Sequence, residues 1–428
     1  MTEKGHPLAP PRLKNDCFAL PPGVDWTPVD TALGRLRANL SPVVGIDEEM
    51  AVVDALGRIL AREAVARRSN PPAPNSAVDG YGFAHAATGE GPQTLPLVEG
   101  RAAAGAPFPG CVPEGRAIRI LTGAILPEGV DTIVLEEDTA SDGPHIAFQG
   151  PIKPRSNTRM AGEDVAAGDV ALPAGHRLRP ADLALLSAVG VGRVSVFRPL
   201  RMGVLSTGDE IAPDAGETML ETDRIYDANR PMLLAMARRW NHVPVDLGHV
   251  GDDRAALVAR LDRSAAEADV IFISGGASAG DEDHVSALLR EAGTMQNWRI
   301  AVKPGRPLAL GLWQGVPVFG LPGNPVAAFV CALIFGRPAL SVLAGGVWEE
   351  PAGFTVPAAF EKNKRAGRRE YLRARLTREG HAEVFRSEGS GRISGLSWAT
   401  GLVEIEDGAR RIVPGDPVRF LPYGSFGL

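Results

Sequence analysis

Residues 270–281 read VIFISGGASAGD, a short apolar run that ends in a loop of glycines and serines. Such a run predicts a strand at 270–274 that is buried on both faces. Two similar transitions flank it along the chain, a strand at 202–206 that leads into STGDE and a strand at 316–320 that leads into LPGNP. Helical patterns separate the strands. This alternation predicts a doubly wound, mostly parallel sheet with helices on both faces.

Further elements of this α/β region, taken as 200–345, follow from hydrophobic periodicity. We expect helices at 227–240, 252–268, 283–292 and 326–335, and strands at 243–250 and 308–311. The segment 316–335 carries no charge over a bilayer's span, but its prolines and its Gly-Asn pair interrupt any helix before Val326. We therefore predict a buried core helix that is too short to cross a membrane.

The regions on either side have a different character. Residues 71–159 hold short strand patterns punctuated by Gly and Pro and predict a β-rich insertion, and residues 349–428 predict a C-terminal β domain. Amphipathic patterns at 31–39, 47–64 and 179–189 predict helices. Together they indicate a discontinuous helical linker domain made of 25–70 and 160–199. The fold class expected is multidomain, α/β plus β.

Composition excludes several classes of protein. The 428 residues carry a net charge of −6, so a general nucleic-acid binder, which needs a basic face, is not expected. Three distant cysteines (Cys17, Cys111 and Cys331) support neither a disulfide framework nor a zinc knuckle. The polar, Pro-rich start resembles no signal peptide. We expect a cytoplasmic protein that does not enter a membrane.

Three loops after predicted strands are the best candidates for a ligand site, since ligands of open α/β sheets bind outside the carboxyl ends of the strands. Their glycines let backbone N–H groups approach a ligand, and their hydroxyls and amide can hold anionic oxygens. Each loop alone is also compatible with an ordinary tight turn. The candidate residues are Ser206, Thr207, Gly208, Ser274, Gly275, Gly276, Ser278, Pro322, Gly323 and Asn324.

Carboxylates crowd the same expected edge: Asp209, Glu210, Asp227, Asp252, Asp281 and Asp283. Carboxylates beside bound phosphate are what Mg²⁺ requires. The alternative is capping of the following helix, which applies to Asp227, Asp252 and above all Asp283. Lys303 and Arg306, in KPGRP, add two cations that could hold an anion. No zinc motif and no hydrolase elbow is present in the sequence.

Read in order, the segments SAVDGY, LTGA, GEDV, STGDE, YDANR, SGGASAGDED, VKPGRP and GLPGNP resemble the molybdopterin molybdotransferase family of the bacterial MoeA and gephyrin E-domain type. The resemblance implies an elongated homodimer that inserts molybdate into adenylylated molybdopterin and releases AMP. The carboxylates at the expected sheet edge make Mg²⁺ the expected cofactor, and an adenylyltransferase and molybdoenzymes are the expected partners. In such a dimer the site lies between the α/β domain of one subunit and the insertion of the other.

Residue by residue, the resemblance assigns roles on both sides of that cleft. Asp79, Thr122 and Asp164 would face it from the insertion, and Glu210, Asp252 and Lys303 would complete the catalytic set. Asp209, Glu210 or Asp281 would hold Mg²⁺. Asp227, Ser274, Gly275, Gly276, Asp283 and the 322–324 segment would bind substrate, as would Arg306, which stands where a second lysine is usual. Arg369, Arg373 and Ser390 are weaker candidates in the last domain.

Two other functions remain open at this point. The Ser-Gly-Gly and LPGNP loops also occur in the related molybdopterin adenylyltransferase, whereas SAVDGY and GEDV distinguish the molybdotransferase. A non-catalytic scaffold, as gephyrin's relatives provide, is the second alternative. The sequence does not separate molybdenum from tungsten as the inserted metal.

Overall fold

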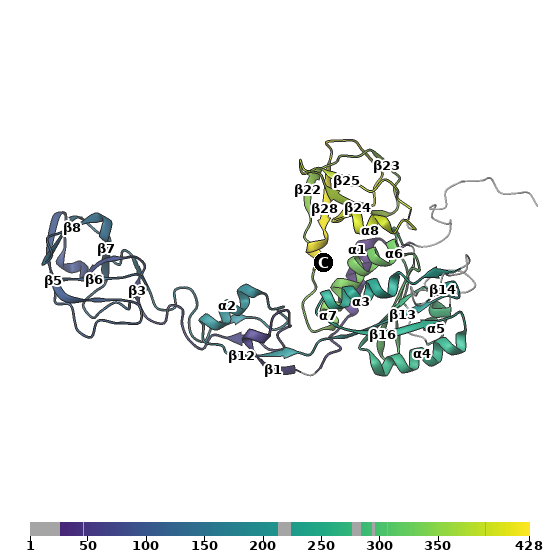
Figure 1. Cartoon of the computed structure of the whole chain (residues 1–428), viewed down its shortest axis with the longest axis horizontal. Coiled ribbons are helices and arrows are strands. Elements are labelled where there is room, and N and C mark those ends of the chain that lie inside the picture. Colours follow the sequence, from purple (N-terminus) through teal and green to yellow (C-terminus); the bar gives the residue numbers. More distant parts are fainter. Residues whose placement is uncertain are drawn as a thin grey trace, which may run out of the picture.

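The computed structural model describes residues 26–45, 47–212, 224–275, 284–292, 296–305, 307–389 and 391–428. The chain is elongated (Figure 1). The β-rich insertion lies at one end, the α/β region and the C-terminal β region lie together at the other, and a narrow linking segment joins them. The α/β region combines parallel and antiparallel strands, so the molecule is a multidomain α/β protein with mixed sheets.

The α/β region is built on a six-stranded sheet of order β16-β13-β17-β21-β20-β18. Its strands are β13 (Arg201–Thr207), β16 (Val243–Val250), β17 (Val270–Ser274), β18 (Gln296–Arg299), β20 (Pro307–Trp313) and β21 (Val316–Leu321). The first four in spatial order are parallel, and β20 and β18 run antiparallel to their neighbours. The parallel core matches the alternation expected from sequence, whereas the edge strand β18 was not predicted.

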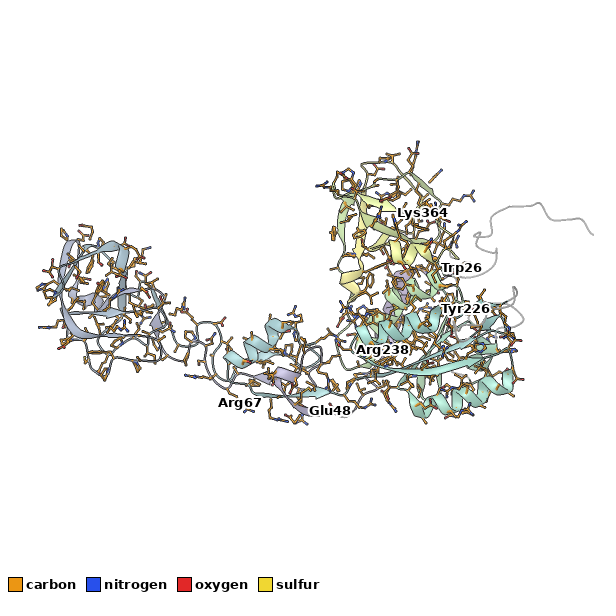
Figure 2. All side chains as sticks on the ribbon, viewed as in Figure 1. Trp26, Glu48, Arg67, Tyr226, Arg238 and Lys364 are labelled. Atoms are coloured by element: carbon orange, nitrogen blue, oxygen red, sulfur yellow. The ribbon has the colours of Figure 1, made fainter. Side chains whose placement is uncertain are left out.

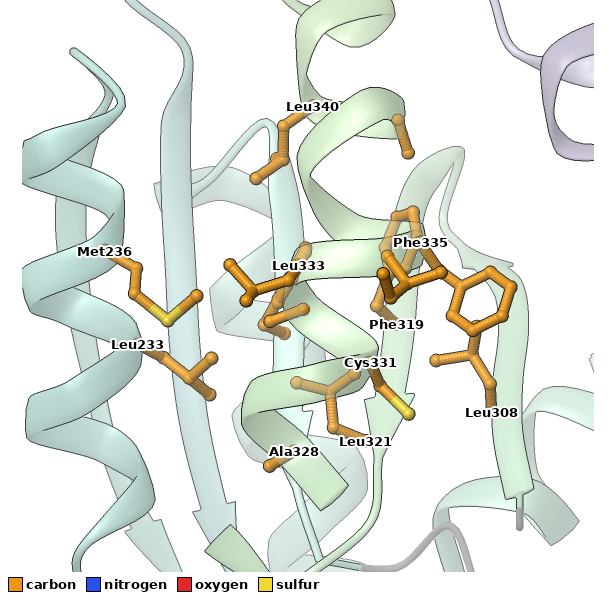
Figure 3. Packing of buried hydrophobic residues seen from close by; sticks show 14 of the residues in the cluster. Leu233, Met236, Leu308, Phe319, Leu321, Ala328, Cys331, Leu333, Phe335 and Leu340 are labelled. Carbon is orange, nitrogen blue, oxygen red and sulfur yellow. The ribbon is translucent and has the colours of Figure 1, made fainter. Parts of the chain in front are cut away.

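Helices cover both faces of this sheet. They are α3 (Asn229–Arg239), α4 (Arg254–Glu267), α5 (His284–Glu291), α6 (Pro325–Cys331) and α7 (Arg337–Leu343). Successive side chains of a strand point to opposite faces. Accordingly Phe272 packs with α3, α6 and α7, and Ile271 packs with α4 and α5. Figure 3 shows the first of these cores, where Leu233 and Met236 of α3 face Leu333.

The helix after LPGNP is longer than expected. From Pro325 to Leu343 it is continuous, because a five-residue π segment (Ala332–Gly336) joins α6 to α7 and Pro338 is accommodated in the first turn of α7. By length and composition this helix could span a membrane, but 94% of its apolar window is buried inside the protein. The prediction of a core helix is confirmed, while its predicted end at residue 335 is wrong.

The linking segment departs most from the sequence expectation. The predicted helix at 47–64 is wrong: the chain forms β1 (Asp47–Ala51), a 3-10 turn η1 (Val52–Asp54) and β2 (Ala64–Val65). β1 pairs antiparallel with β12 (Arg193–Phe197), and β2 pairs with β11 (Val170–Leu172). Pairing with strands more than a hundred residues away outweighs the local amphipathic pattern.

One helix of the linking segment matches its prediction, α2 (Pro180–Ala188). It packs with η1 and β12 in one apolar cluster drawn from both chain segments. The helix α1 (Val29–Asn39) does not belong there, since its buried Val29, Ala32 and Leu36 pack in the α/β core. The linker is therefore mixed rather than helical, and it excludes α1. We propose that the other three domains span 71–159, 200–345 and 349–428.

The insertion is a six-stranded sheet of order β7-β4-β6-β5-β9-β8. Its strands are β4 (Gly80–Phe83), β5 (Gly91–Ala102), β6 (Ala117–Ile120), β7 (Thr132–Leu135), β8 (Thr139–Ser141) and β9 (His145–Gly150), with short 3-10 turns η2 (His85–Ala87) and η3 (Glu136–Asp138). The pair β3 (Asn75–Ser76) and β10 (Thr158–Arg159) closes it toward the linker.

The C-terminal region has a sheet of order β19-β24-β26-β28-β22, with β25 beside β24 and a separate pair β23-β27. Its elements are β22 (Phe354–Pro357), β23 (Lys362–Lys364), β24 (Arg369–Leu376), β25 (Ala382–Val384), α8 (Ser394–Trp398), β26 (Gly401–Ile405), β27 (Arg410–Ile412), β28 (Pro417–Pro422) and η5 (Tyr423–Phe426). The strand β19 (Val302–Lys303) comes from the preceding region and pairs parallel with β24. This places Lys303 directly opposite Glu370.

Candidate active site

The carboxyl ends of β13 and β17 define the candidate site. The chain leaves β13 through α3 toward β16 on one side, then crosses back through α4 to β17 on the other side of β13. Strand order therefore reverses between β13 and β17, with α3 and α4 on opposite faces. Such a reversal leaves a crevice at the strand ends, where open α/β sheets bind their ligands.

The two loops at this crevice approach each other closely. Gly275 has a φ of +92°, and a Cβ built on it would lie 2.5 Å from the Thr207 carbonyl oxygen. Only glycine combines that backbone conformation with that contact. The Thr207 hydroxyl also donates a hydrogen bond of 3.4 Å to the Ser274 carbonyl. The glycine after β17 is thus required by packing.

Asn229, at the start of α3, connects this crevice to the third loop. Its side-chain amide donates to the Ser274 hydroxyl at 2.6 Å and to the Gly323 carbonyl at 2.7 Å. The residue is 5% exposed. One buried side chain therefore holds the ends of β17 and β21 together, and the three loops predicted from sequence meet at one edge.

Two buried polar atoms at the same edge have no hydrogen-bond partner among the described residues: the Ser206 hydroxyl oxygen and the Asn229 side-chain oxygen. An unpartnered buried polar atom costs about 1–3 kcal/mol, and native structures hold few of them. Both lie beside the glycine loops. Unmet hydrogen-bonding capacity at a strand-end crevice is what a polar ligand would satisfy.

Acidic residues gather at the ends of β13 and β16. Asp209 and Asp252 bond reciprocally, each carboxylate accepting the other's backbone N–H, at 3.0 and 3.2 Å. The exposed Glu210 folds back over Gly208, and the His249 ring nitrogen lies 2.7 Å from the Gly208 carbonyl. The two aspartates are thereby fixed side by side, and each keeps an oxygen without a hydrogen bond to the described part of the chain.

Other predicted ligands have structural partners. The Asp227 side chain, 3% exposed, accepts the N–H groups of Asn229 and Arg230 and pairs with the Arg230 guanidinium at 3.2 Å. It therefore caps α3, the alternative role considered from sequence. Asn324 caps α6, its side-chain oxygen accepting the Val326 N–H. At α4 the cap is Asp253, which leaves Asp252 for the contact with Asp209.

Lys303 lies where the α/β and C-terminal regions meet. Its ammonium is 2.6 Å from Glu388 and 3.6 Å from Glu370, and Lys362 pairs with the same two carboxylates. Lys303 borders a pocket of about 190 Å³ that Arg373, Phe385 and Ser387 also line. The loop around Gly305 packs beside Pro322, so this pocket adjoins the LPGNP loop.

Arg373 organises the far wall of this pocket. Its guanidinium donates to the carbonyls of Arg392, Ser387 and Gly389, at 2.5, 2.6 and 3.1 Å. The loop that it holds approaches Asn324, since a Cβ on Gly391 would lie 4.0 Å from the Asn324 side chain. Arg369 instead pairs with Asp30 of α1 at 2.6 Å, which ties that helix to the C-terminal sheet.

The predicted residues of the insertion form small exposed clusters. Asp79 accepts both the backbone N–H and the hydroxyl of Thr122, each at 2.7 Å. These two hydrogen bonds, the hydroxyl's first, hold the pKa of the Asp79 carboxyl below its usual value. Asp164 accepts the Asn70 side-chain amide at 2.9 Å. Both carboxylates are exposed to solvent.

The structure brings one predicted set together and leaves the other apart. Ser206, Thr207, Gly208, Asp209, Ser274, Gly275 and Gly323 share the crevice. Asp79 and Thr122 belong to the insertion, which lies at the opposite end of the molecule (Figure 1), and Asp164 pairs with Asn70 where the insertion joins the linking segment. Figure 2 shows Glu48 and Arg67 on the linking segment between these ends and Tyr226 on the α/β region. The predicted residues outside the described part of the chain are Gly276, Ser278, Asp281, Asp283, Arg306 and Ser390.

Sequence reasoning missed three residues of this edge: Asn229, His249 and Glu388. Asn229 stands in the YDANR segment at a predicted helix start, and this position alone could have indicated a loop-binding amide. Neither His249 nor Glu388 lies in a recognisable motif. Of the described cysteines, Cys111 is exposed and Cys331 is buried, and neither forms a disulfide.

Family models match most of the chain in three consecutive parts. These are the MoeA N-terminal region (domain I and II) at 27–190, the probable molybdopterin binding domain at 203–342, and the MoeA C-terminal region (domain IV) at 355–423. A molybdopterin molybdenumtransferase from Haemophilus influenzae is 33% identical over 402 residues, 92% of this chain and 98% of the relative. This chain belongs to the MoeA family. Molybdopterin molybdenumtransferase 2 of Mycobacterium tuberculosis is 34% identical over 85% of this chain and 92% of its own length.

Solved MoeA structures share the architecture. A crystal structure of a molybdopterin biosynthesis MoeA protein from Pyrococcus horikoshii superposes with a TM-score of 0.72 at 29% identity, covering 93% of this chain and 99% of that chain. A second one from the same organism gives a TM-score of 0.79 at 26% identity, covering 93% and 100%. The resemblance read from the motifs is therefore confirmed along nearly the whole chain.

Proposed function

We propose that this protein inserts molybdate into adenylylated molybdopterin, forming molybdenum cofactor and releasing AMP. The observation that carries the proposal is the crevice between β13 and β17, where close-packed glycine loops meet two buried polar atoms that no described residue satisfies. Molybdopterin molybdenumtransferases match this chain over most of the chain's length. Membership of this family disfavours the adenylyltransferase alternative, because the MoeA N-terminal and C-terminal regions flank the molybdopterin binding domain.

The crevice suits the polar, anionic part of such a substrate. The backbone amides around Gly275 and the Ser206 hydroxyl can donate to phosphate oxygens. Asn229 holds Ser274 and Gly323 in place through its amide, so its side-chain oxygen is left to accept from the ligand. These preformed groups need no rearrangement to bind charge, and that is how a site stabilises charge that develops during a reaction.

Mg²⁺ is the cofactor proposed for this site. Among the described residues no three His, Cys, Asp or Glu side chains form a complete metal site. However, Mg²⁺ is commonly held by one or two carboxylates together with substrate phosphates. The paired Asp209 and Asp252 fit that partial role, and Glu210 is close by. When bound, the ion would neutralise charge on the phosphates.

Molybdate is proposed to enter from the side of Lys303. The pocket beside this lysine opens next to the LPGNP loop and carries the Ser387 hydroxyl on its opposite wall. A tetrahedral oxyanion there would compete with Glu388 for the ammonium. Displacement of one of two carboxylates costs less than leaving a buried cation unpaired, since Glu370 keeps its contact with Lys303.

A homodimer is proposed because the two predicted halves of the site lie far apart in one chain. Asp79, Thr122 and Asp164 would face the crevice of a second copy, where the carboxylates of Asp79 and Asp164 would position molybdate or water. We further propose a cytoplasmic enzyme that receives its substrate from a molybdopterin adenylyltransferase and passes its product to molybdoenzymes.

AMP release tests the function. Purified protein is incubated with adenylylated molybdopterin, molybdate and Mg²⁺, and AMP is measured. We expect AMP to form in proportion to cofactor, and no pyrophosphate from ATP with molybdopterin. Asp252→Asn should slow AMP release, whereas the adjacent Asp253→Asn, which removes a charge but keeps an oxygen that can cap α4, should retain it. Pyrophosphate in place of AMP would establish the adenylyltransferase instead.

A further inference from the structure

The joint between the linking segment and the α/β region contains unsatisfied buried nitrogens. They are Nη2 of Arg177, Nη1 of Arg337 and Nε2 of His242, and none has a hydrogen-bond partner within the described residues. Arg177 follows β11, His242 follows α3, and Arg337 begins α7. Three elements from different parts of the chain thus bring unpartnered nitrogen atoms to one junction.

The charges at this junction do not balance. Arg177 and Arg337 bind the same carboxylate, that of Glu349, through Nε at 3.2 Å and Nη2 at 2.5 Å. Ser341 donates to it as well, at 3.1 Å. The two nearby arginines on the linker side are neutralised elsewhere, Arg58 by Glu48 at 2.7 Å and Arg198 by Asp269 at 2.6 Å. The guanidiniums of Arg337, which is 8% exposed, and of Arg177, whose side chain is 19% exposed, therefore share one negative charge, so one positive charge remains unbalanced.

Within the described residues, the other hydrogen bonds of Arg337 and Arg177 go to backbone carbonyls. Arg337 Nε donates to the Phe426 carbonyl at 3.3 Å, and its guanidinium stacks over the Trp240 ring at 5.7 Å. Arg177 Nη1 donates to the Gly57 carbonyl at 3.1 Å. Burial lowers the pKa of the Arg337 guanidinium to about 10, still well above neutral pH, so the positive charge is retained.

His242 adds a neutral donor. The residue is 5% exposed, and burial, followed by the charges of Arg177 and Arg337, lowers its pKa to about 3. The ring is therefore uncharged at neutral pH and can present an Nε2–H group. A cavity of about 10 Å³ adjoins it, lined by Arg177, Arg58, Arg198 and Asn241 among others. This space admits one particle of about the size of a water molecule.

We propose that Arg177 and His242, with the charge of the neighbouring Arg337, form a binding site for a single monatomic anion of the chloride class. The Arg177 guanidinium and the His242 imidazole line the cavity and supply donors only, and the excess positive charge that Arg337 adds through the shared Glu349 selects an anion over water. A polyatomic oxyanion does not fit the cavity. The ion would join the linking segment to the α/β region. This site is independent of the proposed transferase activity.

Bromide replaces chloride and scatters anomalously, so wild-type crystals grown in sodium bromide test the site directly. We expect an anomalous peak within hydrogen-bond distance of Arg177 Nη2 and His242 Nε2, the unpartnered nitrogens of the residues that line the cavity. A water molecule or an empty cavity there at high bromide concentration would overturn the proposal, whatever the enzyme's activity.

Thermal unfolding in solution gives the second test. At constant ionic strength, replacing gluconate by chloride should raise the Tm of wild-type protein by about 2 °C or more, because an anion bound only by the folded state stabilises it. Arg177→Gln and His242→Phe should lose this chloride-specific rise. Arg58→Gln, at a paired arginine of the same cavity, should keep it. An equal rise in all four proteins, or no rise in wild type, contradicts the site.

Discussion

The two ends of the molecule carry candidate residues in opposite states. At the β13–β17 edge, Ser206 and Asn229 are buried and keep polar atoms that no described residue satisfies. In the insertion and at its junction with the linking segment, Asp79 and Asp164 are exposed, and each is already held by a local partner, Thr122 or Asn70. We propose that the first region binds the ligand and that the second adds groups to a ligand bound there.

This difference assigns separate tasks to the two regions. Changes at the sheet edge should remove substrate binding, and changes in the insertion should slow the reaction of substrate that is still bound. An insertion variant that loses substrate binding, or a sheet-edge variant that binds substrate normally but reacts slowly, would contradict this division.

Gly275→Ala should have the largest effect. The new Cβ would lie 2.5 Å from the Thr207 carbonyl, so the loop after β17 must move out of the crevice. We expect AMP release to fall at least a hundredfold, about 3 kcal/mol or more of lost stabilisation, with substrate binding lost. Activity and equilibrium binding of adenylylated molybdopterin measure it.

Gly415→Ala is the matched control for that substitution. Gly415 has a similar φ of +95°, but open space surrounds its Cβ position. Backbone strain of about 1–2 kcal/mol should therefore lower its stability without affecting binding. Equal loss of binding in both variants would show that strain, and not the crevice contact, causes the effect at Gly275.

Asp79→Asn should have the next largest effect. It keeps the side-chain shape and the bonds from Thr122, but it removes the charge. We expect AMP release to fall on the order of tenfold to a hundredfold while the Kd for adenylylated molybdopterin changes less than about twofold, since no binding group is lost. Single-turnover kinetics with titrated substrate separates the two quantities. A large increase in Kd would contradict the division of tasks.

Thr122→Val should have a smaller effect, confined to the pH profile. The Thr122 hydroxyl lowers the pKa of Asp79, so its removal raises that pKa toward the ordinary value. If the carboxylate is the active form, activity is lost as pH falls through its pKa. The acid limb of the profile should then move to higher pH in Thr122→Val and stay in place in Thr122→Ser. An unchanged acid limb in both variants would show that the Asp79 carboxylate takes no part in the reaction.

Asp269→Asn should have the smallest effect on activity, because it lies outside both regions. Burial opposes its charge, but hydrogen bonds from Arg198 and Arg201 hold the Asp269 pKa at about 2. This lowered pKa contributes stability above the unfolded value of about 3.9 that is lost as pH falls toward 2. The variant should lose on the order of 2 kcal/mol at neutral pH and little near pH 2. Denaturant unfolding at both pH values measures this, with AMP release unchanged at 25 °C.

Local sequence patterns were sufficient for the α/β region. Its parallel strands are short apolar runs, and their loops carry glycines whose role is set within a few residues, as at Gly275. The three loops were therefore predicted together at one edge, which the Asn229 contacts confirm. The residue that joins them was missed because its partners are 45 and 94 positions away.

Features that depend on distant partners could not be predicted. The amphipathic pattern at 47–64 fits a helix, but Met50 pairs with Val194 in a strand. Lys303 was expected to bind an anionic ligand. In the structure it lies opposite Glu370 of β24 and pairs with Glu388. The sequence was compatible with two roles for Asp227, as a helix cap or as a ligand-binding residue. The contacts of Asp227 with Asn229 and Arg230 in the structure indicate the cap.

Mixing two inactive variants tests most directly whether the two ends of different copies form one site. Gly275→Ala and Asp79→Asn chains are co-refolded or co-expressed in equal amounts. If each site takes its crevice from one copy and its Asp79 from the other, half of the dimers are mixed and each has one intact site, so about a quarter of wild-type AMP release returns. If the mixture is no more active than its separate components, the site does not join two chains and the account is wrong.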